Sequence, residues 1–192
     1  SSNASEHLRA FAEKTGIPVA MTLLGLGGFP AEHFLSLDML GMHGTVCSNY
    51  AINEADLLLA LGVRFDDRVT GKVSEFAKHG KIVHIDIDPS SISKRVKVDI
   101  PIVGDVKEVL TEMLGMLQAQ SSRPDAKSLA TWWETIESWR SRDCLKYDRN
   151  NTEVIKPQRV IETLWELTKD ADAYVTSDVG QHQMWAAQFI GY

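Results

Sequence analysis

Four short apolar runs, separated by segments with helical periodicity, constrain the fold of this chain more than any other feature. They cover residues 17–24, 56–62, 81–87 and 100–103. Each run is largely apolar rather than alternating with polar residues, as expected for strands that are buried on both faces of a parallel sheet. Strands that alternate with helices form layered α/β domains. The sequence therefore predicts an α/β domain with a central parallel sheet.

Two further segments carry the periodicity of amphipathic helices. Residues 6–14 place Leu8, Phe11 and Ala12 on one side. Residues 105–117 place apolar side chains at i, i+3, i+4 and i+7 positions. Asp105, followed by Glu108 three residues later, predicts the N-cap of that helix. With the strands, these helices predict a Rossmann-like three-layer αβα domain over residues 5–120.

The composition of the chain excludes several classes of protein. The net charge is −6 and no Lys/Arg cluster exceeds Lys94-Arg95, which argues against nucleic-acid binding. The two cysteines, Cys47 and Cys144, lie far apart without metal-ligand spacing, which argues against a metal site and fits a reducing, cytoplasmic location. No apolar run approaches the roughly 20 residues that span a bilayer, so no membrane association is expected.

The last third of the chain differs in composition, since all five tryptophans lie between residues 132 and 185. A polar stretch over residues 118–125 predicts a domain boundary. Beyond it, a helix is expected with one apolar stripe formed by Leu129, Trp132, Trp133, Ile136 and Trp139. Residues 143–156 are polar and turn-rich, so a linker is expected over residues 121–156.

A second α/β unit is expected to start after the linker. Pro157 suits the first turn of a helix, whose inward face would contain Val160, Ile161, Leu164 and Trp165. Residues 173–177 predict a strand, and residues 178–180 a turn into a final helix. Residues 157–192 are therefore expected to be the truncated start of a second domain, and residues 1–4 an expression scar.

Two segments contain glycines suited to close ligand approach, and the first of them follows a predicted strand. Residues 22–28 read Thr-Leu-Leu-Gly-Leu-Gly-Gly, without the spacing of a dinucleotide-binding fingerprint, so a tight turn is an equal alternative. Residues 39–44 form a loop around His43. Because no nucleophile lies at a suitable spacing, His43 fits a structural role better than a catalytic one.

Two other strand ends carry charged residues. Arg64 could clamp a phosphate or carboxylate, or it could pair with Asp66 in a surface ion network. Asp86 could accept hydrogen bonds from ribose or ribityl hydroxyls. Asp86 and Asp88 also share one side of a strand, which leaves an acid–base pair as a weaker alternative. Together the four segments favour a nucleotide-like ligand along the sheet edge.

Several longer strings carry a family resemblance. In order they are Gly16-Ile-Pro-Val-Ala20, Thr22-Leu-Leu-Gly-Leu-Gly27, Leu40-Gly-Met-His-Gly-Thr45, Asn49-Tyr-Ala-Ile-Asn-Glu-Ala-Asp56, Gly62-Val-Arg-Phe-Asp-Asp-Arg-Val-Thr-Gly71, Lys81-Ile-Val-His-Ile-Asp-Ile-Asp88 and Gly104-Asp-Val106. These strings resemble the central domain of the acetohydroxyacid synthase (acetolactate synthase) large-subunit family. Residues 177–188, with Gly-Gln-His-Gln-Met-Trp, resemble the start of its thiamine-diphosphate domain. The resemblance covers residues 5–188.

The resemblance implies an enzyme that decarboxylates pyruvate on thiamine diphosphate and joins the two-carbon unit to pyruvate or 2-oxobutyrate. That reaction belongs to branched-chain amino acid (isoleucine and valine) synthesis. It also implies Mg²⁺ with the thiamine diphosphate, and FAD without a net redox role. By position, the FAD-binding segments would contain Thr22, Leu23, Leu40, Gly41, Met42, His43, Gly62, Val63, Arg64, Phe65, Asp66, Asp86, Ile87, Asp105 and Val106.

The resemblance also assigns the start of the last helix. Gln181 and His182 would contact thiamine diphosphate, and Gln183 would reach the flavin side. Catalytic residues and metal ligands of the family have no counterpart in this sequence, nor do the first strand and glycine turn of the central domain. We therefore expect the isolated chain to be inactive and to retain no cofactor. The expected partners are the remaining domains, a second catalytic subunit in a homo-oligomer, and a regulatory subunit.

Two other hypotheses remain open at this point. One is another thiamine-diphosphate enzyme, such as glyoxylate carboligase or pyruvate oxidase, which would share the fold. The other is a stand-alone nucleotide-binding or regulatory module. Residues 178–188 distinguish the second hypothesis, since such a module has no use for the start of a thiamine-diphosphate domain.

Overall fold

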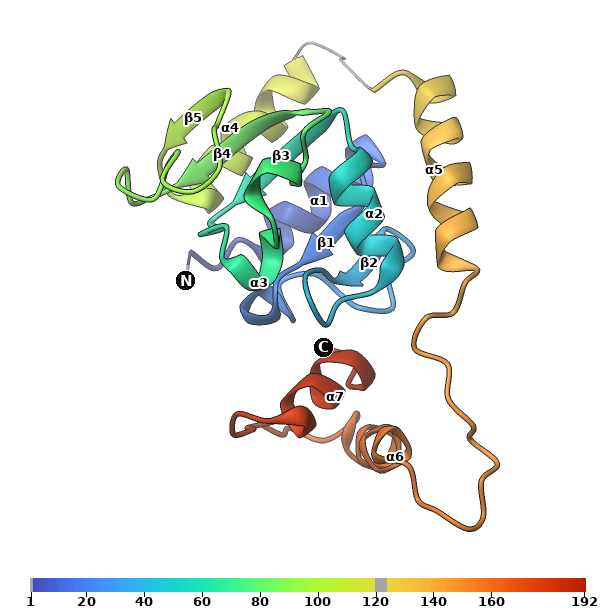
Figure 1. The fold of residues 1–192 in the computed structure, drawn as a ribbon. Coiled ribbons are helices and arrows are strands. Elements are labelled where there is room, and N and C mark those ends of the chain that lie inside the picture. The colour runs from blue at the N-terminus through green and yellow to red at the C-terminus, as the bar shows by residue number, and fades with distance from the viewer. Residues whose placement is uncertain (1, 120–123) are drawn as a thin grey trace.

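The computed structural model describes residues 2–119 and 124–192 of the chain (Figure 1). Within these residues the strands are β1 (Val19–Met21), β2 (Ser36–Met39), β3 (Leu57–Leu61), β4 (Lys81–Asp86) and β5 (Ile100–Val103). The helices are α1 (Ser5–Thr15), α2 (Val46–Glu54), α3 (Asp67–Thr70), α4 (Val106–Ala119), α5 (Ala126–Arg140), α6 (Pro157–Thr168) and α7 (Gln181–Phe189). Short 3₁₀ helices η1 (Leu23–Gly25) and η2 (Val73–Glu75) complete the set.

The strands form two parallel sheets. β3, β4 and β5 form one, with β4 in the centre, and β1 pairs with β2 in the other. Residues Ile82 to Asp86 of β4 are all buried, as expected for the central strand of a parallel sheet that is covered on both faces. The predicted α/β class with parallel strand pairing is confirmed.

The prediction that residues 17–24 join the other three predicted strands in one sheet is wrong. β1 pairs instead with β2, a strand that the sequence pattern did not reveal, and the register shifts between Val19 and Met21. Among the described residues, β1 and β2 thus form a sheet of their own, apart from β3, β4 and β5. β2 escaped prediction because Asp38, with a φ of 61°, interrupts its apolar run.

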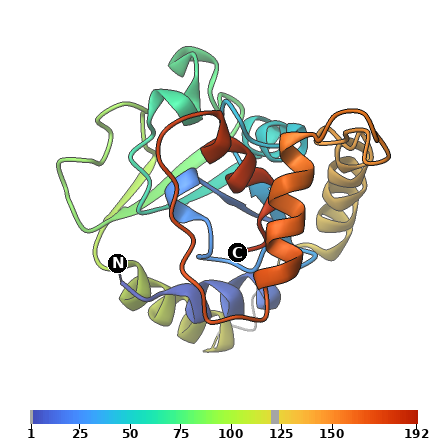
Figure 2. The ribbon, with the colours of Figure 1, turned by 90° about the horizontal axis from the view of Figure 1, so that it is seen from below.

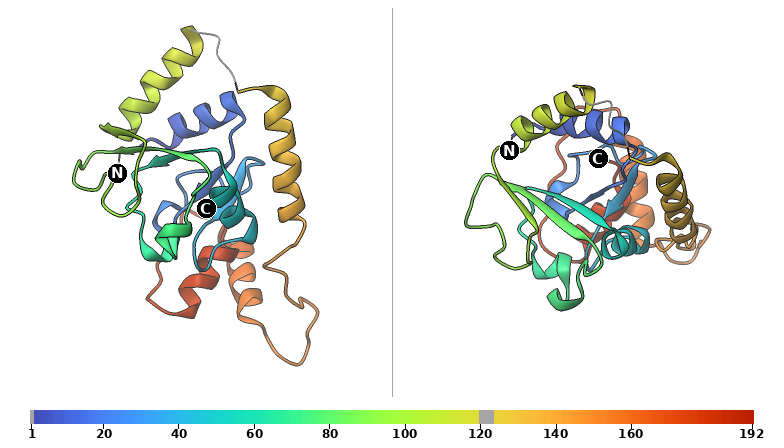
Figure 3. Two further views of the ribbon diagram at one scale, coloured as in Figure 1. Left: turned by 45° about the horizontal axis from the view of Figure 1, so that its top comes forward. Right: turned by 90° about the horizontal axis from the view of Figure 1, so that it is seen from above.

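Helices cover the sheets from both sides (Figure 3). α1 and α4 lie side by side on one face, and α2 lies on the other, with α5 packed against it. The predicted inward residues Phe11 and Ala12 of α1 are buried, and Leu110 of α4 is only 1% exposed. Asp105 caps α4 as predicted, since its Oδ1 accepts the backbone N–H of Lys107 at 2.8 Å.

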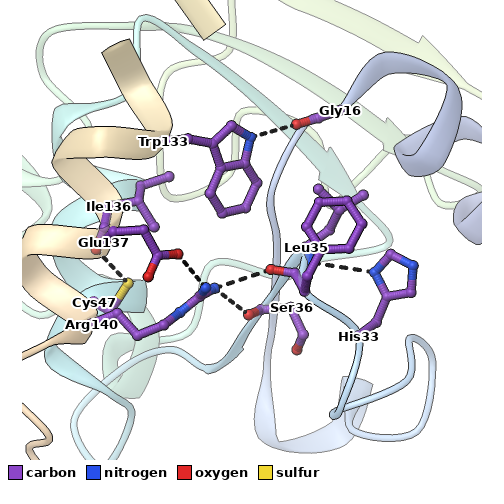
Figure 4. Close-up of polar contacts among 10 residues, drawn as sticks. Gly16, His33, Leu35, Ser36, Cys47, Trp133, Ile136, Glu137 and Arg140 are labelled. Atoms are coloured by element: carbon purple, nitrogen blue, oxygen red, sulfur yellow. Dashed lines mark hydrogen bonds and ion pairs between the residues drawn. The ribbon is translucent and has the colours of Figure 1, made fainter. Parts of the chain in front are cut away.

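α5 is attached to the sheets through polar contacts as well as its apolar stripe (Figure 4). The indole N–H of Trp133 donates to the Gly16 carbonyl at 2.9 Å, and Arg140 Nη2 donates to the Ser36 carbonyl at 2.9 Å. Ile136, between them on the helix, is fully buried against Cys47 of α2. The predicted stripe on this helix is therefore confirmed.

The end of the chain departs from prediction. Pro157 begins α6 as expected, and Ile161 and Trp165 are partly buried as predicted, but Val160 and Leu164 are 53% and 47% exposed. Residues 173–177, predicted as a strand, form none in the structure, because no neighbouring strand supplies backbone partners and Tyr174 is 95% exposed. The centre of the predicted boundary, residues 120–123, lies outside the described residues. The division into domains stays a prediction.

α6 and α7 pack together beyond the end of the sheets where α3 lies (Figures 1 and 2). Gln188 Nε2 of α7 donates to the His43 carbonyl at 2.8 Å, and Ala31 N donates to the Tyr192 carbonyl at 3.1 Å. Across residues 2–119 and 124–192, no helix is both long and apolar enough to cross a membrane.

Candidate functional site

The loops that follow the five strands form one edge of the molecule, which we call the carboxyl edge. Ligands bind at such an edge in parallel α/β sheets. The predicted central-domain site residues all lie in these loops or are the first or last residue of an adjoining helix or strand: Thr22, Leu23, Leu40, Gly41, Met42, His43, Gly62, Val63, Arg64, Phe65, Asp66, Asp86, Ile87, Asp105 and Val106. The structure thus gathers at strand ends what the sequence distributes over 85 positions, from 22 to 106.

The loops after β2 and β3 lie directly against each other and connect the two sheets. Met42 N donates to the Arg68 carbonyl at 2.8 Å. Gly41 has a φ of +100°, and a Cβ at this position would lie 2.5 Å from the Arg68 carbonyl oxygen. Only glycine fits this close approach, so the packing of the two loops requires glycine at position 41.

Asn49 of α2 holds the Gly41 loop, and sequence reasoning missed it. Its side-chain Oδ1 accepts the Gly41 N–H at 2.9 Å, while its Nδ2 donates to the Gly41 carbonyl at 3.0 Å. One amide thus satisfies both backbone groups of Gly41. The only sequence signal for this contact is an asparagine one turn into a helix that follows a glycine-rich loop.

Arg64 extends from the end of β3 into solvent. Its side chain is 69% exposed, and Nη2 lies 3.4 Å from Asp66 Oδ2. The predicted surface ion pair therefore exists, but an exposed pair of this length contributes little. Since it engages one corner of the guanidinium, donors remain for an anionic ligand.

Asp66 is the N-cap of α3, and its local hydrogen bonds favour the ionised carboxylate. A hydrogen bond with the Asp67 side chain, followed by the Arg68 backbone N–H, lowers the pKa of Asp66. Its position as the N-cap of α3 is consistent with that shift. Asp66 therefore adds a negative charge beside Arg64.

Phe65 contributes through its backbone, because its side chain belongs to the core. The ring is 3% exposed and packs edge-on against Phe76 and His84, at centroid distances of 5.9 and 5.1 Å. Its φ is +51°, a region that non-glycine residues rarely occupy. The buried ring holds this strained backbone in place, so packing in the core positions the neighbouring Arg64.

Asp86 is the buried acid of the carboxyl edge. It is 8% exposed, its Oδ1 accepts the Asp88 N–H at 2.8 Å, and its Oδ2 lies 3.8 Å from His84 Nε2. Asp88 instead accepts hydrogen bonds from Ser90 and Ser91, and the Ser90 contacts lower its pKa. Asp88 is thus engaged in its own loop, which does not favour the alternative of an acid–base pair.

The ends of β3, β4 and β5 are contiguous. Gly62 N donates to the Ile85 carbonyl at 2.8 Å, and Gly104 N donates to the Asp86 carbonyl at 3.0 Å. A Cβ on Gly62 would touch Val106 at 4.0 Å. Asp105 follows Gly104 and caps α4 through one of its carboxylate oxygens. These backbones form a continuous surface along the edge.

The glycine-rich segment after β1 is a turn, as the alternative interpretation of the sequence proposed. Thr22 Oγ1 accepts the Gly25 N–H at 3.1 Å and starts η1, and Gly28 N donates to the Gly25 carbonyl at 2.9 Å. The amide groups of Gly25 and Gly28 are therefore engaged within the turn. Leu24 is 87% exposed beside them.

The predicted residues of α7 lie at its first turn. Gln181 and His182 are exposed and Gln183 is half-buried, with Gly180 before them as the N-cap. A cavity of about 30 Å³ lies where the other end of α7 meets the loop after β2. Met39, His43 and Gln188 are among the residues that line it. Gln188, whose amide binds the His43 carbonyl, was not predicted from sequence.

A metal centre is not formed by this part of the protein. Among residues 2–119 and 124–192, no group of three or more His, Cys, Asp or Glu side chains could hold a metal ion. The carboxyl edge instead combines backbone groups, one exposed cation and one buried carboxylate. Such a set suits an extended ligand with phosphate and hydroxyl groups.

Comparison with known proteins gives a consistent result. Residues 1–113 match the family described as thiamine pyrophosphate enzyme, central domain. The chain is 52% identical over 187 residues to acetolactate synthase isozyme 3 large subunit of Escherichia coli, covering 97% of this chain and 32% of that protein. It is 50% identical to acetolactate synthase 1, chloroplastic, of Zea mays, covering 98% of this chain and 29% of that protein. The chain thus spans about a third of the length of these curated relatives.

Proposed function

The chain belongs to the thiamine pyrophosphate enzyme family through its central domain, and from that premise we propose that it is a central segment of an acetolactate synthase large subunit. The whole enzyme would decarboxylate pyruvate and join the resulting two-carbon unit to a second 2-oxo acid. About half of the aligned residues are identical to those of acetolactate synthase large subunits from bacteria and of an acetolactate synthase from a plant. The match runs through α7, which supports more than a general likeness of fold.

Within that enzyme, we propose that this segment holds FAD along the carboxyl edge. The residues present fit the group. Arg64 offers free donors of the kind that pair with phosphate, and Asp86 Oδ2 offers an acceptor for a hydroxyl. The backbone at Gly62, where an added Cβ would meet only Val106 at 4.0 Å, allows close approach. These side chains bind and orient the cofactor in the proposal, and they take no part in bond making.

We also infer that the start of α7 serves thiamine diphosphate, which supplies carbanion stabilisation when it is bound. Gln181 and His182 are exposed at the N-terminal turn of α7, where their polar groups can meet a ligand. Gln183 is turned further toward the protein. Mg²⁺ would accompany the thiamine diphosphate through residues outside this segment.

The names of the relatives support a further part of the proposal. Several of them are large subunits, a term that implies a smaller partner. We therefore propose that the enzyme assembles with a second catalytic subunit and with a regulatory subunit.

The observation that carries the cofactor proposal is the alignment of Arg64, Asp86 and Asp105 after three adjacent strands of one parallel sheet. Residues at successive strand ends lie along one edge, as an extended dinucleotide requires. An arginine in a surface ion pair alone would need no such neighbours.

The test is an Arg64→Ala substitution in the full-length enzyme. A charged hydrogen bond to phosphate contributes about 1.5–3 kcal/mol, so FAD retention is expected to weaken by about 10- to 100-fold. Flavin content per protein is measured after gel filtration, with far-UV circular dichroism as the test of folding. Arg9→Ala, which removes an exposed arginine paired with Glu13 on α1, is the matched control. Unchanged flavin content in Arg64→Ala would assign Arg64 to the surface ion pair alone.

A further inference from the structure

A second concave site lies away from the carboxyl edge, between α2 and α5. It is a cavity of about 420 Å³ that opens to solvent and is lined by Tyr50, Glu54, Trp132, Thr135 and Trp139. We call it the aromatic cup. None of these residues belongs to the loops at the strand ends, so the proposed cofactor site does not account for it.

The spacing of the residues explains how the cup forms. Tyr50 and Glu54 are four residues apart on α2, and therefore lie on the same face one turn apart. Trp132 and Trp139 are two turns apart on α5, with Thr135 between them. Because α2 and α5 pack against each other, both faces meet at the cup.

The three rings are arranged as walls rather than as a stack. Trp139 is in the middle, with the Tyr50 ring 5.5 Å from it at 79° and the Trp132 ring 5.7 Å from it at 84°. Two rings that are both nearly perpendicular to a third present aromatic surface from more than one direction. A cation that enters the cup can lie against these ring faces, which attract it through the ring quadrupole.

The electrostatics of the cup favour a positive charge. Aromatic ring faces carry the negative part of the ring quadrupole, and Glu54 adds an exposed carboxylate. Arg142 already shows the preference, because its guanidinium carbon lies 5.2 Å from the centre of the Tyr50 ring. Arg142 does not line the cavity itself, so the cup remains open to a second cation.

Attachment of α5 does not require an open cup. The helix is held by the fully buried Ile136, by the Trp133 hydrogen bond to Gly16 and by the Arg140 hydrogen bonds to Phe34 and Ser36. Tyr50, by contrast, remains 42% exposed on the rim. An aromatic surface with an adjacent carboxylate is thus left available to solvent.

We propose that the aromatic cup binds a cationic side chain, the guanidinium of arginine or the ammonium of lysine, presented by a partner protein. A wide, open cup makes contact on three sides only, which suits a side chain that its own protein already holds in place. The site is independent of the proposed cofactor role, since it shares no residue with the carboxyl edge.

The experiment is a titration of the full 192-residue chain, labelled with ¹⁵N at tryptophan, with a capped Gly-Arg-Gly peptide. We expect the indole N–H signals of Trp132 and Trp139 to shift, while those of Trp133, Trp165 and Trp185 stay in place. The matched probe is Gly-citrulline-Gly, a neutral isostere of the arginine peptide, which is expected to cause no shift at equal concentration. Equal shifts with citrulline, or no shift with arginine, would overturn the proposal.

Variants test the electrostatic part separately. Glu54 is exposed, so Glu54→Gln leaves folding intact and is expected to weaken binding about two- to fivefold. Arg142→Gln removes the internal cation over Tyr50, and binding is expected to stay equal or tighten. Unchanged affinity in Glu54→Gln, or weaker binding in Arg142→Gln, would argue against a cation site. Free guanidinium ion that binds as tightly as the peptide would show a small-molecule site in place of a partner side chain.

Discussion

The sheet region, residues 2–119 together with α5, and the tail region, residues 141–192, use similar sequence patterns with different results. In the sheet region, α1 and α4 turn apolar stripes inward and Leu110 is 1% exposed. In the tail region, α6 has a clear apolar stripe and a proline at its start, yet none of its residues is buried. Leu167 of α6 is 79% exposed. The amphipathic pattern is therefore the same, but the surface that it meets differs.

The difference shows that periodicity specifies a helix and its apolar face, while burial depends on a second surface. α4 finds that surface on α1 and β4. α6 packs mainly on α7, whose own buried residues are Ala186 and Ala187. Small side chains of this kind bury little apolar area. We therefore expect the tail region to open at a lower free energy than the sheet region.

The largest expected effect comes from a matched pair of leucine truncations. Leu110→Ala in α4 removes a buried side chain and leaves a cavity, so the free energy of unfolding should fall by about 2–5 kcal/mol. Leu167→Ala in α6 changes an exposed position and should cost less than about 0.5 kcal/mol. Urea unfolding followed by far-UV circular dichroism measures both. Similar losses for the two variants would break the contrast between the regions.

Helix capping gives a smaller effect and sharpens the same contrast. Asp105 caps α4, whereas Lys156, at the equivalent position of α6, makes no side-chain cap. Asp105→Ala should lower the free energy of unfolding by about 0.5–2 kcal/mol. Asp105→Asn should cause a smaller loss, because asparagine also caps helices. Lys156→Ala should have almost no effect in the same urea experiment. Equal losses in Asp105→Asn and Asp105→Ala would show that capping is not the cause.

Sequence reasoning predicted β4, β5 and the start of α4 in the sheet region, because their signals are local. The apolar runs at 81–87 and 100–103 differ from β4 and β5 by one residue at most, and the cap at Asp105 follows from residue type alone. The strand ends also brought the expected site residues to one edge. Burial and capping depend on the types and spacing of neighbouring residues, so they can be predicted without knowledge of the fold.

Contacts between distant segments could not be predicted in that way. Asn49 binds both backbone groups of Gly41 because α2 packs beside the loop, and Gln188 reaches His43 across 145 positions. The aromatic cup depends on α2 meeting α5, which no spacing within either helix reveals. The strand predicted at residues 173–177 failed for the same reason, since a strand exists only with a neighbour.

The smallest expected effect is the loss of one ion pair in the tail region at low pH. Glu162 of α6 accepts hydrogen bonds from Arg149 Nη2 at 2.7 Å and from the Tyr147 hydroxyl, which attaches the segment before α6 to that helix. The Arg149 hydrogen bond lowers the pKa of Glu162 from its ordinary value of 4.5. A lowered folded-state pKa means that the contact stabilises fully above pH 4.5 and is lost as the pH falls through the lowered value.

Hydrogen exchange of the segment from Tyr147 to Lys156, corrected for intrinsic rates, should therefore increase relative to the sheet region as the pH falls below 4.5. Glu162→Gln removes the titrating charge, so this segment should exchange faster at neutral pH and lose the extra increase in acid. Glu166→Gln, one turn later and exposed, serves as the matched control and should behave as the unsubstituted chain does. If Glu162→Gln retained the full acid response, another group would control the linker, and the tail region would be held by contacts other than this ion pair.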